Sequence, residues 1–218
     1  MDLQWACMWV SKAIGEKDKM DKIFKCPPGQ EELTSNFQRE IYSENEYNRF
    51  GMGIKEGDVV LDCGGNVGVF TQYALDMGAS QVLSYECDEP HFKCYEENIT
   101  DDRAKCTMGF VGHGHYDLTK IFEQHQIDKI DFAKIDIEGA EWDMFTHMKV
   151  EDMLKIDRWA IEFHTYYFHQ GYNERFKLDK LWDFLKILEM FSVNGYEIKF
   201  EHVHKAWDPI HLYARKAN

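Results

Sequence analysis

Acidic and basic residues close several apolar stretches of this sequence, and their types can hold a cation or move a proton. Side-chain alternation in extended chain places Asp136 and Glu138 on one side of one stretch, and Glu162 and His164 on one side of another. Burying such charges without partners would be costly, so we expect all four to line a cleft. His164 or Asp136 would act as the base there, with Glu138 and Glu162 as supports.

Two other interpretations of these four residues remain open. Asp136 could only cap the helix that follows it. The four together could also coordinate a hard divalent cation that lowers the pKa of a hydroxyl group. We favour a polar cleft without a metal ion, because ligand-type residues on two strands also serve that purpose.

A glycine-rich turn follows the apolar run Val59–Leu61, in the order Asp62-Cys63-Gly64-Gly65-Asn66-Val67-Gly68. A strand, a glycine turn and a helix bring backbone N–H groups up to a ligand. The dinucleotide pattern G-x-G-x-x-G does not fit, because Asn66 and Val69 occupy its second and third glycine positions. No Gly-Lys-Ser/Thr of a phosphate loop follows either.

The charge of Asp62 narrows the choice of ligand. A carboxylate at the turn would repel a pyrophosphate but attract an ammonium or sulfonium group, and S-adenosylmethionine carries both. We expect Asp62 to face the amino group of this cofactor. The residues expected to shape the pocket around it are Gly64, Gly65, Asn66 and Gly68.

Glu86 ends a second apolar run, Gln81–Tyr85. An acid at the end of the second strand can accept hydrogen bonds from both ribose hydroxyls of a nucleoside. This position suits NAD as well as S-adenosylmethionine, so Glu86 predicts a nucleoside without choosing the cofactor.

With Lys134-Ile-Asp-Ile-Glu-Gly-Ala-Glu141, the glycine-rich turn resembles the FkbM-like family of class I S-adenosylmethionine-dependent methyltransferases, over about Glu40 to Phe163. One departure is Gly65, where the family more often has alanine. The resemblance implies O-methylation of a hydroxyl group on a sugar or a small natural-product-like acceptor. It also implies that Cys87 and Asp88 lie beside the adenine, and that Asp136 helps to bind the cofactor.

Apolar runs and helical periodicity alternate along most of the chain, which predicts an α/β fold with helices on both faces of the sheet. We expect the Rossmann-like sheet of class I methyltransferases, mostly parallel with an antiparallel C-terminal edge hairpin. Strands are predicted from Val59, at 81–85, 105–111, 130–137 and 159–163, and at 196–203 and 210–215 in the hairpin; helices are predicted at 67–77, 89–98, 117–125, 141–153 and 178–193.

Residues 1–36 are expected to form an N-terminal cap or extension, and residues 37–218 a single methyltransferase domain. An aromatic segment, residues 165–172, follows the fifth predicted strand and would suit contact with an acceptor ring or a sulfonium cation.

Composition restricts the partners. The net charge is −14, which disfavours binding to nucleic acid and to anionic membranes. The resemblance to the FkbM-like family implies a small-molecule or glycan acceptor. The chain has no apolar run of about 20 residues, and an acid near its start is unlike a secretory signal, so we expect a cytoplasmic protein. The six cysteines form no C-x-x-C pair and are expected to be reduced thiols.

Two other classes of protein remain as alternatives. An NAD-dependent oxidoreductase is disfavoured by the missing dinucleotide pattern and by Asp62 at the strand end. A binding module that keeps a nucleoside pocket without catalysis agrees with the same residues.

Overall fold

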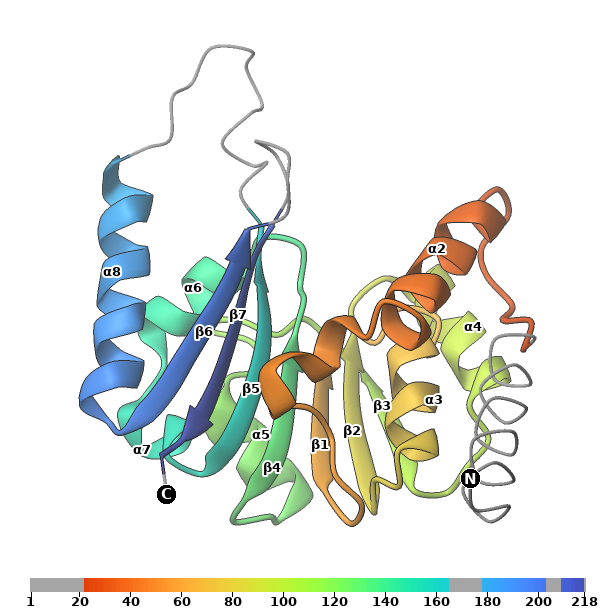
Figure 1. The fold of residues 1–218 in the computed structure, drawn as a ribbon. Helices are drawn as coiled ribbons and strands as arrows, with labels where there is room; N and C mark the ends of the chain where they lie inside the picture. Colours follow the sequence, from red (N-terminus) through yellow and green to blue (C-terminus); the bar gives the residue numbers. More distant parts are fainter. Residues whose placement is uncertain (1–21, 165–177, 203–208, 218) are drawn as a thin grey trace, which may run out of the picture.

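The computed structural model describes residues 22–164, 178–202 and 209–217, and within these ranges one sheet runs in the order β3-β2-β1-β4-β5-β7-β6 (Figure 1). Strands β1 to β5 are parallel, and β7 pairs antiparallel with both β5 and β6. The predicted parallel sheet with an antiparallel edge hairpin is therefore confirmed. The strands are β1 Val59–Cys63, β2 Gln81–Glu86, β3 Ala104–Met108, β4 Ile130–Ile135, β5 Ile156–Phe163, β6 Tyr196–His202 and β7 Ile210–Lys216.

Helices cover both faces of the sheet, as predicted, because alternate strand residues are apolar on each side (Figure 1). Leu61 and Leu83 pack under α5 to α8, whereas Val60 and Val82 pack under α2, α3 and α4. The helices are α2 Glu31–Tyr42, the 3₁₀ helix η1 Glu46–Gly51, α3 Val69–Asp76, α4 Glu89–Asn98, α5 Leu118–His125, α6 Glu141–His147, α7 Val150–Met153 and α8 Leu178–Val193.

Two predicted helix starts are confirmed by their caps. The Asp88 carboxylate accepts a hydrogen bond from the backbone N–H of His91 at 3.2 Å, and Asp117 accepts one from that of Lys120 at 2.9 Å. These caps satisfy N–H groups that have no partner inside their helices, so both helices begin where the sequence predicts.

The single helix predicted from Glu141 to Met153 is wrong. The chain becomes extended at Met148 and Lys149, which separates α6 from α7. Met144 and Met153 nevertheless enter the same core cluster. Helical periodicity could not reveal the break, because both short helices bury apolar residues in one core.

The fourth strand is shorter than predicted and ends at Ile135. The chain then turns, with Glu138 at a φ of 55° and Gly139 at 101°. Asp136 and Glu138 therefore stand on a loop beyond the sheet rather than on a strand.

Helix α2 crosses position 36, where we expected the N-terminal extension to end. In the described part of the chain, every helix is too short or too polar to cross a bilayer.

Candidate active site

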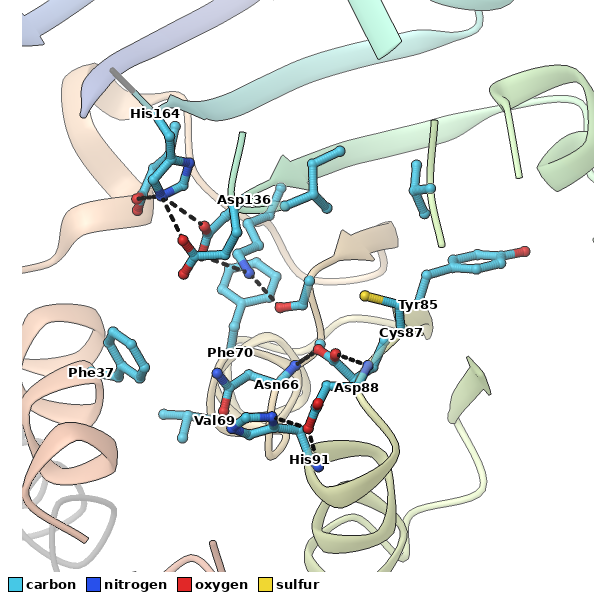
Figure 2. A pocket seen from close by; sticks show the side chains of 18 of the residues that line it. Phe37, Asn66, Val69, Phe70, Tyr85, Cys87, Asp88, His91, Asp136 and His164 are labelled. Carbon is cyan, nitrogen blue, oxygen red and sulfur yellow. Dashed lines mark hydrogen bonds and ion pairs between the residues drawn. The ribbon is translucent and has the colours of Figure 1, made fainter. Parts of the chain in front are cut away.

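A cavity of about 700 Å³ opens at the carboxyl ends of β1, β2, β4 and β5 (Figure 2). Parallel α/β sheets commonly bind ligands at this edge, because the loops that leave neighbouring strands meet there. Figure 2 shows Asp136 and His164 at one end of the cavity and Cys87, Asp88 and His91 at the other. Helices α2 and η1 close the side, through residues such as Phe37, Glu40 and Tyr47.

The turn after β1 passes very close to the loop after β4. A Cβ atom on Gly64 would lie 1.8 Å from the backbone oxygen of Asp136, and the φ of Gly64 is +91°. The N–H groups of Gly64 and Gly65 both donate to the carbonyl oxygen of Tyr85, each at 2.9 Å. The turn is thus fixed to β2 and fitted against Asp136, and Gly64, Gly65 and Asn66 line the cavity.

Glu86 is held rigidly at the end of β2. One carboxylate oxygen accepts the backbone N–H of Asn66 and the other that of Asp88, both at 2.7 Å. Each oxygen retains lone pairs for a ligand, since a carboxylate can accept about four hydrogen bonds. Glu86 lines the cavity, as do Cys87 and Asp88. Asp88 also contacts the ring of His91, with 2.6 Å between Oδ2 and Nδ1.

Two residues expected to bind the cofactor do not line the cavity. Asp62 is fully buried, accepts a hydrogen bond from the Thr71 hydroxyl at 2.8 Å and lies 3.4 Å from the Lys134 ammonium. Gly68 is fitted to the core instead, because a Cβ atom there would lie 2.5 Å from Ile99 Cγ1. The structure thus differs from the direct contacts expected of both, and it gives them packing and hydrogen-bonding roles beneath the turn.

Lys134 links the turn to the end of the cavity that holds Asp136 and His164, which we call the acidic end. Its ammonium donates to the carbonyl oxygen of Gly64 at 2.7 Å and lies 3.3 Å from Asp136 Oδ2. Burial lowers the pKa of Lys134, but the carboxylates of Asp136 and Asp62 outweigh burial and raise it above its ordinary value. Lys134 is therefore a buried, charged group that holds both loops.

The Lys134→Met substitution is expected to lower the free energy of unfolding by about 3 kcal/mol, because it leaves the Asp62 carboxylate buried without a countercharge. Urea denaturation measures this loss. Adding Asp62→Asn should restore part of it, whereas Lys129→Met, at a side chain that is 54% exposed, should change stability by less than about 1 kcal/mol. A Lys134 variant as stable as the wild type would contradict the assigned role.

His164 is the centre of the acidic end. Its Nδ1 lies 2.8 Å from Glu141 Oε1, and its Nε2 lies 3.7 Å from Asp136 Oδ1 and 3.6 Å from Glu138 Oε2. Nε2 is also 3.9 Å from Glu162 Oε2. Burial lowers the pKa of His164, but Glu141 and the nearby carboxylates more than offset this, so the pKa is raised. The four residues predicted to line one cleft do come together.

Further residues complete this end, and most were not predicted from the sequence. The Tyr47 hydroxyl donates to Glu162 at 2.8 Å and lies 3.5 Å from Asp136 Oδ2. Glu46 and His211 approach within 3.4 Å, and Glu141 lies behind His164. Their proximity depends on the 3₁₀ turn and on the pairing of β7 with β5, neither of which has a short-range sequence signal.

Crowded carboxyl groups make this end of the cavity strongly acidic. Burial, reinforced by the charges of Glu40 and Asp136, raises the pKa of Glu46 to about 7. Burial and the charges of Asp136 and Glu46 likewise raise the pKa of Glu162 well above its usual range. A positive group bound here would relieve this repulsion. The predicted aromatic segment, residues 165–172, lies outside the described residues.

The fold is that of class I methyltransferases. Aeropyrum pernix fibrillarin, whose structure contains natively bound S-adenosyl-L-methionine, superimposes with a TM-score of 0.52 and 14% identity over 77% of this chain and 70% of its own. Precorrin-6y C5,15-methyltransferase from Geobacter metallireducens superimposes with a TM-score of 0.52 and 12% identity, over 90% of this chain and 96% of its own. A Clostridium thermocellum protein assigned to rRNA methylation superimposes with a TM-score of 0.57 and 10% identity, over 80% of this chain and 95% of its own. At these identities the likeness concerns the fold alone.

A sequence model of the Methyltransferase FkbM domain matches residues 10–198, and the chain therefore belongs to this family. It is an S-adenosylmethionine-dependent methyltransferase, and the cofactor prediction is confirmed. The match begins inside the segment 1–36 that we expected to be an extension. Comparison with curated proteins found no sequence that matches this chain.

The described residues fit this cofactor. Glu86, with both oxygens fixed by backbone N–H groups, would accept hydrogen bonds from the ribose hydroxyls. Cys87 and Asp88 would stand beside the adenine, and Gly64 and Gly65 leave room for close approach to the turn. A volume of about 700 Å³ is typical of sites for cofactors and small ligands.

Proposed function

We propose that this methyltransferase transfers its methyl group to a hydroxyl oxygen of a small acceptor, such as a sugar or a natural-product-like molecule. The observation that carries the proposal is the position of His164, whose Nε2 faces the carboxylates of Asp136 and Glu138 at the end of the cavity away from Asp88. A hydroxyl nucleophile begins protonated, so it benefits from a nearby proton acceptor.

When bound, S-adenosylmethionine would supply a methyl group on a sulfonium, and sulfur would keep the bonding electron pair as an acceptor oxygen bonded to the methyl carbon. His164 Nε2 or the Asp136 carboxylate takes the hydroxyl proton. Glu141 holds the imidazole ring in place, and Glu138 and Glu162 stabilise the positive charge that the ring gains. Holding the acceptor and the methyl group close together supplies much of the remaining rate.

The charge of the protein supports a small acceptor rather than a nucleic acid. The net charge is −14, and Glu40, Glu46 and Glu162 add acidic groups to the cavity wall. Phosphate groups would be repelled there, whereas neutral hydroxylated molecules would not. A transfer assay with radiolabelled S-adenosylmethionine checks this choice: sugars, phenols and glycans are expected to accept label, and label found only on RNA would refute the proposal.

Binding of the cofactor depends on Glu86 in this proposal. Calorimetric titration is expected to show micromolar affinity for S-adenosylmethionine and S-adenosylhomocysteine, and none for NAD. Glu86→Gln should weaken both by about 10-fold to 100-fold, because a charged acceptor of two ribose hydrogen bonds is lost.

Glu89→Gln is the matched control, since Glu89 is exposed, pairs with Lys93 on α4 and does not line the cavity. Its affinity for S-adenosylhomocysteine should equal that of the wild type. Equal affinity in the Glu86 variant would show that the ribose is bound elsewhere. Binding without transfer to any acceptor would favour a module that has lost catalysis.

A further inference from the structure

We propose that Asp136, Glu138 and His164 bind one divalent transition-metal ion at the acidic end of the cavity, an inference that rests on the proposed function and deepens it. The three residues each offer one ligand atom, and these atoms all lie within 4.8 Å of one another. One imidazole with two carboxylates is a donor set that suits Mn²⁺, Fe²⁺ or Zn²⁺.

The distances fit an ion better than direct hydrogen bonds. His164 Nε2 is 3.7 Å from Asp136 Oδ1 and 3.6 Å from Glu138 Oε2, beyond hydrogen-bond length. Ligand atoms about 2.1 Å from an octahedral ion stand about 3 Å apart when adjacent and about 4 Å when opposite. The two separations from Nε2 lie between these values, and Glu138, with a side chain that is 67% exposed, is the least buried of the three residues.

Asp136 divides its two oxygens between different partners. Oδ2 faces the Lys134 ammonium at 3.3 Å and the Tyr47 hydroxyl at 3.5 Å, whereas Oδ1 faces the imidazole. The buried lysine therefore compensates one side of this carboxylate and leaves Oδ1 directed toward Nε2. An ion between Oδ1 and Nε2 would not have to displace Lys134.

His164 is oriented from behind by Glu141, which is not one of the three proposed ligands. Its side chain is 7% exposed, and Nδ1 contacts Glu141 Oε1, which also accepts the backbone N–H of Ile137 at 2.9 Å. An ionised carboxylate only accepts, so Nδ1 carries the proton and the lone pair of a neutral ring is on Nε2. Metal-binding histidines are commonly fixed by a carboxylate in this way.

Glu141 adds a second, separate indication. It is fully buried, and its Oε2 has no hydrogen-bond partner within the described residues. A buried carboxylate with one unsatisfied oxygen is costly unless a positive charge is near. A divalent ion on the opposite nitrogen of His164 would supply that charge.

The ion would change which group activates the acceptor. A hydroxyl on an open coordination position becomes more acidic, and Glu162, which accepts from Tyr47 close to Nε2, can take its proton. His164 would then be a ligand rather than the base. No electron is transferred in this step, so the ion needs no redox chemistry.

A titration of metal-free protein with Mn²⁺ tests the site, with free Mn²⁺ followed by electron paramagnetic resonance. We expect one site with a micromolar dissociation constant. Glu138→Ala and His164→Gln should each weaken binding at least 10-fold, and Glu141→Gln about 10-fold to 100-fold. Glu46→Gln, in the neighbouring cluster of Glu46, Glu162 and His211, and Glu151→Ala, at an exposed residue of α7, should bind like the wild type.

The result that overturns the inference is an absence of saturable Mn²⁺ binding at millimolar concentration, or binding that Glu46→Gln removes and Glu138→Ala does not. Glu138→Ala keeps the test decisive if His164→Gln fails to fold, because the Glu138 side chain is exposed. S-adenosylhomocysteine is titrated into the same samples. If it binds where Mn²⁺ does not, the ion site is refuted and the methyltransferase pocket stands; if it also fails to bind, the proposed function fails.

Discussion

Gly64→Ala is expected to weaken the binding of S-adenosylmethionine and S-adenosylhomocysteine at least about 100-fold. The added Cβ atom would stand 1.8 Å from a backbone oxygen of Asp136, which cannot turn aside as a flexible side chain could. The turn must therefore move away from the β4 loop, and a shift of about 1 Å in a binding site can cost about 100-fold in function. Calorimetric titration measures the affinity.

Gly57→Ala separates this contact from backbone strain. Gly57 has a φ of +86° but nothing within 4 Å of its would-be Cβ atom. Its substitution should cost about 1 kcal/mol of unfolding free energy, from the left-handed conformation alone, and leave cofactor affinity unchanged. Wild-type affinity in the Gly64 variant would mean that the close approach to Asp136 is not needed for binding.

His164→Gln is expected to lower the rate of methyl transfer about 100-fold to 10,000-fold while S-adenosylhomocysteine still binds. This is the range that a positioned proton acceptor contributes, and loss of a metal ligand would act in the same direction. Glutamine retains an amide that can donate to Glu141, which protects the buried carboxylate. Single-turnover assays with a saturating cofactor measure the rate.

His147→Gln is the matched control, because His147 is also close to a carboxylate, Asp143, yet its side chain is 48% exposed and away from the cavity. Its rate should equal that of the wild type. If His164→Gln and Asp136→Ala both transfer methyl groups at the wild-type rate, neither residue activates the acceptor and the proposed mechanism is wrong.

Most of the fold could be predicted from local sequence patterns. Apolar runs marked the strands, and Asp88 and Asp117 marked helix starts, because each effect acts between residues close in the chain. The meeting of Glu162 with His164 followed from strand periodicity. The proximity of His164 to Asp136 followed from the rule that parallel strands end at one edge of a sheet.

The contacts that escaped prediction depend on packing in three dimensions. His211 faces Glu162 because β7 pairs with β5 in a register that the spacing of the hairpin does not set. Asp62 stands at a strand end, as expected, yet Thr71 of α3 and Lys134 of β4 hold it beneath the turn, and both contacts depend on tertiary packing. Glu141 is the first residue of α6, and its sequence context gives no sign of the contact with His164.

The place of β7 bears on how the protein is made. β6 precedes β7 in the chain, but β7 lies between β5 and β6, so during synthesis β6 leaves the ribosome before the strand that joins it to the sheet. Until residue 216 has emerged, the hydrogen-bonding groups on one side of β5 have no partner, and open edges of this kind invite aggregation. The Tyr213 hydroxyl, which donates to the carbonyl oxygen of Glu46, belongs to β7 and becomes available only with that strand. The acidic end of the cavity is therefore completed only after β7 has joined β5, and a nascent chain stalled before β7 would expose β5 to a chaperone.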